Sequence, residues 1–429
     1  MNNDFLQRVN LYFEDNSNRY LVELNKPCSQ AFFINTNKAN YEDIFKIIDF
    51  EYEPSPLTEV SFYHNLDNIG KTKAYDLGLI YPQEIAASIT ASKVDIENVK
   101  VVVDMCAAPG GKTINILNRL PKDSICISND VTYKRALTLS SNLERLGLDN
   151  VVITSKKTSE LANQLESTAD LVILDAPCSG EGMIRKYPEI LDDYSINNIV
   201  NLASIQKDLL EDAYKILKEN GQLLYSTCTY AFEEDENQIR DFLSLHSDME
   251  LIDLGEGYSS KLKGTIKLTP LNNTEGQFIC LMKKKTGINT RLKTLKPTKE
   301  KIVDDYISHN LVLDSYYLYK HNNQFFLSLI ELPDLKNNVL KNGIYIGDIV
   351  NNRFEPNHNL YRSNSLIGKY KYVYDLNDEE YLTFISGNEL NVELENEYYL
   401  VTYKNHSLGF GKASNNHLKN KYPKGLRRN

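Results

Sequence analysis

The sequence predicts a doubly wound α/β sheet for the central part of the chain, and two observations favour this fold class. Continuous apolar runs of strand length recur between residues 98 and 282, and segments with helical periodicity separate them. This alternation is typical of a mostly parallel sheet with helices on both faces. Ligands of such sheets bind beyond the carboxyl ends of the strands, so we expect the functional residues there.

The predicted elements follow one another in a regular order. Residues 132–148 and 197–220 have the spacing of amphipathic helices. The second helix is expected to reach Asn220, because the pair Asn220-Gly221 is a common stop signal. The predicted strands are the apolar runs at 98–105, 124–130, 150–155, 170–177 and 221–228.

The flanking regions predict smaller parts of a different character. The first 75 residues mix short helical and strand-like patterns, including "QAFFINTNK". Short Tyr-rich runs near the other end, such as 314–332 and 396–412, predict β-rich modules. We therefore expect an N-terminal extension (1–75), the α/β domain (76–285), a basic linker (286–301), a small middle domain (302–360) and a C-terminal domain (361–429).

The composition is that of an ordinary globular protein. Of the 429 residues, 41% are hydrophobic and 25% are charged, which suits a chain with its own packed cores. Its apolar runs are shorter than the ~18 residues of a membrane span, and its start is too polar for a signal peptide. We expect a cytoplasmic protein without a membrane partner. The six cysteines have no zinc-like spacing, so we expect reduced thiols and no metal.

The charge is unevenly distributed along the chain. The formal net charge of -10 argues against a polyanionic partner, but two segments oppose it. Lys283–Lys301 carries eight basic residues and one acid. The part from Val401 onward carries seven basic residues and no acid, with Tyr403, Phe410 and Tyr422 interleaved. Such segments are either a solvated linker and tail or contacts to RNA, where phosphates pair with cations and rings stack bases.

The stretch "DMCAAPGGKT", residues 104–113, predicts a ligand-binding turn between a strand and a helix. Cys106 stands where a P-loop requires its first glycine, and the adjacent glycines do not fit a dinucleotide fingerprint. Asp130, 19 residues beyond Gly111, is a usual partner of ribose hydroxyls. A ribose ligand without a pyrophosphate loop points to S-adenosylmethionine, although an ordinary α/β turn also favours Gly, Pro and Asp.

Two cysteines follow two predicted strands and would face the same crevice. Cys178 lies with Asp175 after the fourth strand, and Cys228 lies after the fifth. Each alone could be an inert buried residue. A thiolate that adds to carbon 6 of cytosine, with an acid at N3, makes carbon 5 able to accept a methyl group, and a base then helps remove the carbon 5 proton. The spacing does not say which cysteine attacks.

These motifs together resemble a known family. The segments "DMCAAPGGKT", "NDVTYKR", "DAPCSGEGMIRK" and "YSTCTYAFEEDENQI", preceded by "GLIYPQEIAAS", resemble the motifs of the Nop/Sun family of RNA (cytosine-5) methyltransferases. "RFEPNHNL" and the ending "LGFGKASNNHLKNKYPKGLRR" resemble the bacterial branch that methylates 16S ribosomal RNA near the decoding site. The resemblance implies a Rossmann-like methyltransferase sheet and a PUA-like C-terminal module that binds RNA.

The resemblance also implies roles for individual residues. Cys228 would be the nucleophile, Cys178 would assist product release and Asp175 would hold the cytosine. S-adenosylmethionine would be the cofactor, and 16S rRNA or the small ribosomal subunit the partner of a monomeric enzyme. The implied cofactor contacts are Cys106, Ala107, Ala108, Pro109, Gly110, Gly111, Lys112, Asp130, Arg135 and Asp175.

Some positions depart from the family pattern or from a catalytic interpretation. Lys157 stands at about the place of an Asp that contacts the adenine end of the cofactor in many relatives, and Phe33 replaces an Arg that precedes Asn35-Thr36. His246 and the acids from Glu233 to Glu236 are expected to form a solvated helix start. Alternatives to rRNA methylation are the same chemistry on another RNA, such as tRNA, and a non-catalytic ribosome-assembly protein.

Overall fold

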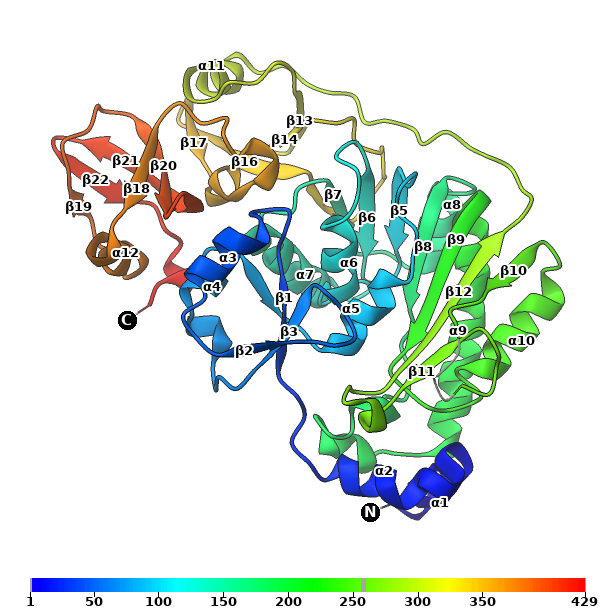
Figure 1. Cartoon of the computed structure of the whole chain (residues 1–429). Helices are drawn as coiled ribbons and strands as arrows, with labels where there is room; N and C mark the ends of the chain where they lie inside the picture. Colours follow the sequence, from blue (N-terminus) through cyan, green and yellow to red (C-terminus); the bar gives the residue numbers. More distant parts are fainter. Residues whose placement is uncertain (1, 256–259, 429) are drawn as a thin grey trace.

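The computed structural model describes residues 2–255 and 260–428, and the strands in these residues form four sheets (Figure 1). A nine-stranded sheet forms the centre of the molecule, and sheets of four, four and five strands flank it. None of the helices among the described residues is long and apolar enough to cross a membrane.

The central sheet confirms the predicted doubly wound α/β fold. Its five middle strands are parallel, and the strands at both edges are antiparallel to their neighbours. A short strand, β11 (Ile266–Leu268), also pairs with β12. In spatial order the sheet comprises β10 (Met249–Ile252), β12 (Gln277–Lys284), β9 (Leu217–Thr227), β8 (Ala169–Asp175), β5 (Val101–Asp104), β6 (Ile125–Asn129), β7 (Val151–Thr154) and β15 (Val339–Asn342).

Helices cover both faces of this sheet because successive strand residues point to opposite sides. Val102 packs in the core with α5, α6 and α7, whereas its neighbour Val103 packs in the core with α8, α9 and α10. The helices are α5 (Ile85–Ser92), α6 (Gly111–Leu117), α7 (Tyr133–Leu146), α8 (Thr158–Gln164), α9 (Ile196–Ile216) and α10 (Glu236–Leu245).

One predicted boundary is wrong. Helix α9 ends at Ile216, and β9 begins at Leu217, so the helix does not reach Asn220. Leu217 pairs with Ala169 of β8, and the register then shifts before Leu171 pairs with Gln222. Asn220 has a φ of 63° within this irregularity. The Asn-Gly pair therefore shapes a bulge in the strand and does not stop the helix.

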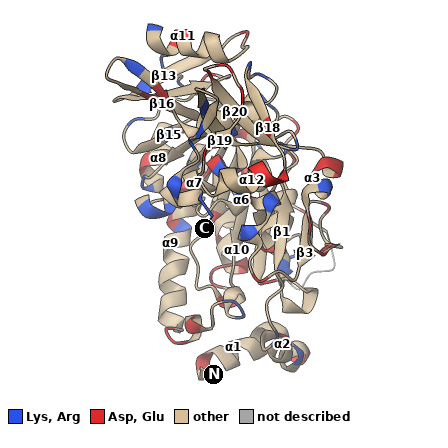
Figure 2. Ribbon diagram, turned by 90° about the vertical axis from the view of Figure 1, so that its left-hand side faces the viewer, with Lys and Arg blue, Asp and Glu red and all other residues tan. Residues whose placement is uncertain are grey.

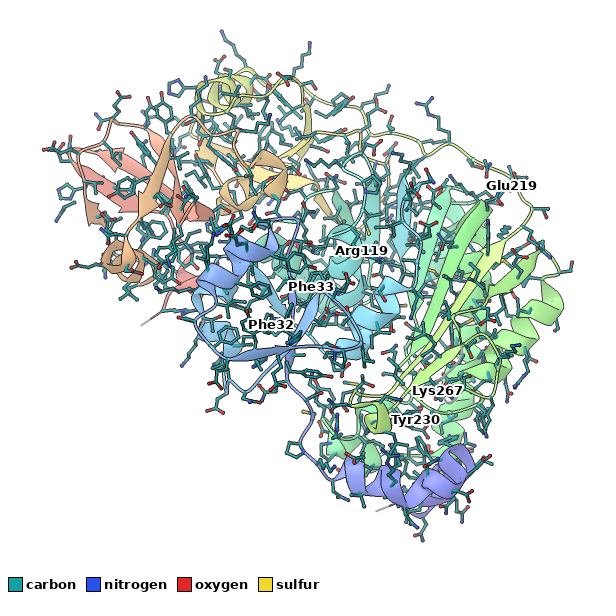
Figure 3. All side chains as sticks on the ribbon, viewed as in Figure 1. Phe32, Phe33, Arg119, Glu219, Tyr230 and Lys267 are labelled. Atoms are coloured by element: carbon teal, nitrogen blue, oxygen red, sulfur yellow. The ribbon has the colours of Figure 1, made fainter. Side chains whose placement is uncertain are left out.

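The N-terminal region contributes two separate units. Helices α1 (Asn3–Phe13) and α2 (Ser17–Leu24) lie below the central sheet in Figure 1. The next unit is a sheet in the order β2 (Tyr52–Pro54), β3 (Ser61–His64), β1 (Ala31–Ile34) and β4 (Ile80–Pro82), with α3 (Tyr41–Ile47) and α4 (Lys73–Asp76). Figure 3 shows Phe32 and Phe33 in this sheet, where both side chains are buried.

The chain beyond the central domain forms two further sheets. The first follows α11 (Lys301–Asn310) and has the order β13 (Tyr317–His321), β14 (Gln324–Ser328), β16 (Ile344–Val350), β17 (Arg353–Pro356). The second has the order β18 (Val373–Leu376), β20 (Tyr398–Tyr403), β21 (His406–Ser414), β22 (His417–Asn420), β19 (Leu390–Asn391), and is accompanied by α12 (Asp378–Ile385).

The aromatic residues of the basic C-terminal segment do not lie on the surface. Tyr403, Phe410 and Tyr422 are 1%, 4% and 4% exposed, respectively. They belong to the hydrophobic cores of the C-terminal sheets, so these rings are not available to stack bases as the sequence suggested. The lysines between them remain exposed, including Lys404, Lys412 and Lys419.

Candidate active site

The predicted ligand-binding turn connects β5 to α6 at the carboxyl edge of the sheet. Gly110 has a φ of 114°, and a Cβ atom there would come within 2.9 Å of Leu139 Cδ1, so glycine is required. Thr113 Oγ1 donates a hydrogen bond of 2.6 Å to Asp104 Oδ2. Asp104 is fully buried, and burial raises the pKa of its carboxyl to about 7. Its other oxygen, Oδ1, has no hydrogen-bond partner.

The end of β6 places a second carboxylate beside the turn. Asp130 is 1% exposed, and its Oδ1 accepts a hydrogen bond from the backbone N–H of Thr132. Arg135 Nη1 lies 3.3 Å from Asp130 Oδ2, which accepts no hydrogen bond. Arg135 Nη2 donates to the Ala108 carbonyl at 2.7 Å. The structure therefore brings Asp130 and Arg135 next to the turn, and their contact with a cofactor stays a prediction.

Lys112 links the turn to the end of β8. Its Nζ lies 2.8 Å from Asp175 Oδ2, and Ser226 Oγ donates a 2.7 Å hydrogen bond to Asp175 Oδ1. A pocket of about 200 Å³ opens beside this pair. Its walls include Asp104, Asp175 and all of the predicted turn residues except Gly110: Cys106, Ala107, Ala108, Pro109, Gly111 and Lys112.

The two predicted cysteines meet at the ends of β8 and β9. Cys178 Sγ lies 3.1 Å from Cys228 Sγ and also accepts a hydrogen bond from the Cys228 backbone N–H. Both are free thiols. The hydrogen bond with Cys228 and then burial raise the pKa of Cys178 well above its usual range. Cys178 therefore keeps its proton and can donate it to the sulfur of Cys228 in a hydrogen bond.

Two buried carboxylates hold the cysteine loops: Glu234, which the sequence predicted to be solvated, and Glu181, for which the sequence indicated no role. Glu234 accepts hydrogen bonds from the Ser179 N–H and from Gln206 Nε2, which also donates to the Pro177 carbonyl. Burial raises the pKa of Glu234 to about 7. Glu181 accepts hydrogen bonds from Thr229 Oγ1 and the Tyr230 N–H, so it connects the loop after β8 to the loop after β9.

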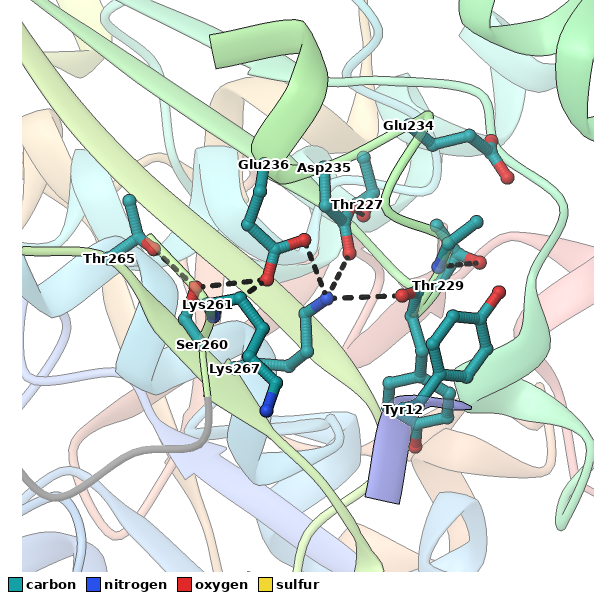
Figure 4. A network of polar contacts seen from close by, with 12 residues as sticks. Tyr12, Thr227, Thr229, Glu234, Asp235, Glu236, Ser260, Lys261, Thr265 and Lys267 are labelled. Carbon is teal, nitrogen blue, oxygen red and sulfur yellow. Dashed lines mark hydrogen bonds and ion pairs between the residues drawn. The ribbon is translucent and has the colours of Figure 1, made fainter. Parts of the chain in front are cut away.

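The acids after Cys228 do not form a solvated helix start, in contrast to the prediction. Glu234, Asp235 and Glu236 are 0% exposed, and only Glu233 is half-buried. Figure 4 shows the reason: Lys267 Nζ of β11 lies 3.0 Å from both Asp235 and Glu236. His246 is likewise mostly buried, with its ring against Tyr214 and its Nε2 3.0 Å from Glu211.

The N-terminal helices support this loop from below. Tyr12 OH donates to Glu181, and Arg8 forms an ion pair with Glu233. Phe13 stacks on Tyr20 with ring centroids 4.0 Å apart, and both rings contact Tyr230. In Figure 3, Tyr230 and Lys267 lie beside this end of the molecule. Residues far apart in sequence thus determine the position of the loop that begins at Cys228.

The two departures from the family pattern lie at structured positions. Lys157 is exposed at the start of α8, while its neighbour Lys156 is buried and donates to Gln164 Oε1 at 3.0 Å. Phe33 is 2% exposed within β1. Asn35, which follows it closely, donates to the carbonyls of Gly78 and Leu146.

Two carboxylates at the ends of β5 and β6 fit S-adenosylmethionine in their chemistry; Asp104 lines the 200 Å³ pocket, whereas Asp130 is not one of its lining residues. Asp104 Oδ1 and Asp130 Oδ2 are buried carboxylate oxygens without a hydrogen-bond partner. Such oxygens require donors, and the ammonium group and the ribose hydroxyls of S-adenosylmethionine are donors. Within residues 2–255 and 260–428, no three His, Cys, Asp or Glu side chains are grouped so that they could hold a metal ion.

Comparison with known proteins identifies related sequences and folds. Residues 91–283 match the family described as 16S rRNA methyltransferase RsmB/F, and residues 371–428 match the methyltransferase RsmF PUA domain. A tRNA (cytosine(49)-C(5))-methyltransferase from Pyrococcus abyssi is 36% identical over 63% of this chain and 93% of that protein.

Two further relatives agree with this result. A ribosomal RNA small subunit methyltransferase F from Aliivibrio fischeri is 28% identical over 62% of this chain, which spans 60% of that protein. The crystal structure of a methyltransferase homologue from Pyrococcus horikoshii superposes with a TM-score of 0.58 at 28% identity, covering 65% of this chain and 94% of that one. The chain therefore belongs to the Nop/Sun family of RNA (cytosine-5) methyltransferases, with the PUA domain of the 16S rRNA branch.

Proposed function

We propose that this protein transfers a methyl group from S-adenosylmethionine to carbon 5 of a cytosine in 16S rRNA, through a covalent cysteine-cytosine adduct. The observation that carries the proposal is the 3.1 Å contact between Cys178 and Cys228 at the strand end that also holds Asp175. In this proposal the protein acts in the cytoplasm as a monomer, on 16S rRNA or the small ribosomal subunit. The domain at 76–285 carries the chemistry, and residues 1–75 and 361–429 bind RNA.

The cofactor would be held by residues at the ends of three strands: β5, β6 and, through Asp175, β8. Cys106 to Lys112 would contact it through the turn after β5, and Asp130 with Arg135 through the end of β6. Asp130 Oδ2 and Asp104 Oδ1 would accept its hydroxyl and ammonium hydrogens, because both oxygens are buried and accept no hydrogen bond from the protein, although Arg135 Nη1 lies 3.3 Å from Asp130 Oδ2. When bound, S-adenosylmethionine supplies an electrophilic methyl group.

The cysteines and Asp175 would act in sequence on the base. Cys228 Sγ, as a thiolate, forms a bond to carbon 6, while Asp175, as the protonated acid, donates a hydrogen bond to N3 and stabilises the negative charge that moves into the ring. Carbon 5 then accepts the methyl group. Loss of the carbon 5 proton to a base re-forms the double bond and breaks the bond to sulfur. Cys178 S–H donates to the leaving Cys228 thiolate and so assists release.

A tRNA substrate is the second candidate. The 36% identity to a tRNA methyltransferase over 93% of its length favours it, whereas the match to the RsmF PUA domain favours rRNA. Both candidates use the same reacting groups. A non-catalytic assembly protein would not require two thiols beside a carboxylate.

The test compares wild type, Cys228→Ala and Cys178→Ala with labelled S-adenosylmethionine on unmodified 16S rRNA, small subunits and tRNA. We expect Cys178→Ala to accumulate a denaturant-resistant protein-RNA adduct and Cys228→Ala to give neither adduct nor product. Reversed phenotypes would exchange the roles of the two cysteines. Absence of transfer by wild type to every RNA, together with no cofactor binding in calorimetry, would support the assembly role.

A further inference from the structure

A second, larger pocket lies between α7 and the C-terminal part of the chain. It has a volume of about 810 Å³ and is bounded by four parts of the chain: residues 70–76, the second half of α7, residues 345–362 and residues 422–428. Asn142 of α7 lines this pocket and donates to the Pro109 carbonyl at 2.9 Å, so this side chain connects the pocket wall to the predicted ligand-binding turn.

Two arginines in its wall, the buried Arg362 and the half-buried Arg145, have no carboxylate partner. Arg362 is 2% exposed, and its Nη1 donates to the carbonyls of Ser407 and Leu408. The Arg145 guanidinium lies 3.8 Å from the Tyr75 ring centroid and donates to the carbonyls of Tyr75 and Ile80. Neither forms an ion pair with any residue that the structure describes, and the Nε of each has no hydrogen-bond partner.

The carboxylates nearby are already paired. Asp76 lies 2.6 Å from Arg428 Nη2 and accepts a hydrogen bond from Tyr381, and Glu144 lies 3.4 Å from Lys341 Nζ. Burial, and then the positive charges of Arg362 and Lys38, lower the pKa of His358 well below its usual value. Figure 2 shows cationic segments around α7 and the end of the chain. The pocket wall thus has uncompensated positive charge in a protein whose formal net charge is -10.

Buried charge without a counterion is costly, so an anion in the pocket would stabilise the structure. We propose that this pocket binds the phosphate backbone of the RNA substrate. The proposal rests on the proposed function, because it takes the ligand to be the RNA that is methylated. The volume exceeds that of a single phosphate group. The pocket is lined by residues of the α/β domain and of the region that matches the PUA domain, so RNA bound here would contact both.

The test adds a negative charge at two open positions of the pocket. Ser141 is exposed on α7, and a Cβ atom at Gly425 has no heavy atom within 4 Å. The variant Ser141→Glu/Gly425→Glu is compared with Ser141→Gln/Gly425→Gln, which has nearly the same shape without the charge. Binding of a labelled 16S rRNA transcript is titrated at several salt concentrations, and cofactor binding is measured by calorimetry.

We expect the Glu pair to bind the transcript about tenfold more weakly than the Gln pair, with a shallower salt dependence and unchanged cofactor affinity. Equal affinities of the two variants would overturn the proposal. A second result would also overturn it: inorganic phosphate stabilises wild type but not the Glu pair, while the two variants bind RNA equally well. The pocket would then bind a small anion and not RNA. RNA binding is measured without methyl transfer, so it tests only the pocket. The methyl-transfer assay described above tests the proposed methyltransferase function.

Discussion

Lys112 Nζ lies 2.8 Å from Asp175 Oδ2, so the last predicted residue of the cofactor turn directly contacts the carboxylate proposed to hold the cytosine. Lys112 is 9% exposed, whereas the Asp175 side chain is 37% exposed and open to the pocket. The lysine therefore fixes the carboxylate from its buried side. In the proposed function, cofactor binding and base binding would share this ion pair.

Replacement of this lysine tests that coupling. Lys112→Met keeps the apolar stem but removes the cation, and a hydrogen bond to a charged group contributes about 1.5–3 kcal/mol. We expect single-turnover methyl transfer to fall by about tenfold or more. Lys122→Met, at an exposed lysine, is the control and should retain the wild-type rate. A wild-type rate in Lys112→Met would show that Asp175 does not depend on this contact.

The pKa of Glu234 predicts how stability changes with pH. Burial raises this pKa from its usual 4.5 to about 7, so between these values the folded protein holds a proton that the unfolded chain has lost. The stability contributed by the protonated form is complete below pH 4.5 and is lost as the pH rises through 7. Glu234→Gln should remove this loss, which amounts to about 3 kcal/mol at most.

Melting temperatures of wild type and Glu234→Gln from pH 5 to pH 8 provide the measurement. Glu233→Gln is a control of opposite sign, because the hydrogen bond with Arg8 lowers the pKa of Glu233. Its pairing already stabilises the protein fully above pH 4.5, so this variant should lose the same stability at every pH from 5 to 8. Parallel curves for wild type and Glu234→Gln would contradict the prediction.

Phe13 tests the support of the Cys228 loop by the N-terminal helices. Phe13→Ala removes a buried ring that contacts Tyr20 and Tyr230, which should cost about 3–5 kcal/mol of stability. Leu11→Ala changes the same helix at a side chain that is 52% exposed, and it should stay within about 0.5 kcal/mol. Urea unfolding and methyl transfer are measured on both variants. Equal behaviour of the two would show that α1 does not support the loop.

The exposed lysines of the C-terminal sheet predict salt-dependent RNA binding. Lys412 and Lys419 are paired across β21 and β22, so both point to the same side of the sheet. Lys412→Gln/Lys419→Gln should weaken RNA binding and lower the slope of log K against log salt by about 0.7–0.9 per lost phosphate contact. Cofactor affinity should not change. An unaltered slope would show that these lysines are solvated and do not contact RNA phosphates. Deletion from Val401 onward would be uninformative, because it removes β21 and β22.

The sequence predicted the central sheet well because its strands carry their own signal. Each parallel strand is buried on both faces and is therefore a continuous apolar run, as in "LVILD" of β8. The residues that follow these strands, Asp130, Asp175, Cys178 and Cys228, could be placed at one edge from that pattern alone. The end of α9 could not, because the Asn220-Gly221 pair serves a bulge as readily as a helix end.

Long-range pairing explains what the sequence did not predict. Three carboxylates in a row look solvated in the sequence, but Lys267, 31 residues after Glu236, lies against Asp235 and Glu236. Glu234 is held separately, by Ser179 and Gln206. A single lysine between Ile266 and Leu268 in a buried strand was the available signal, since such a charge requires a partner. Tyr403 and Phe410 lie among lysines in the sequence, which suggested exposed rings. In the strands the lysines point to solvent and the two rings point into a core.

The short strand β15 has a consequence for any attempt to isolate the catalytic half. It comes from residues 339–342, more than 50 residues beyond β12, yet it covers the outer edge of β7. A fragment that ended after β12 would leave the backbone N–H and C=O groups of β7 free along that edge. Such an edge is a template for pairing with another chain, so we expect the fragment to self-associate.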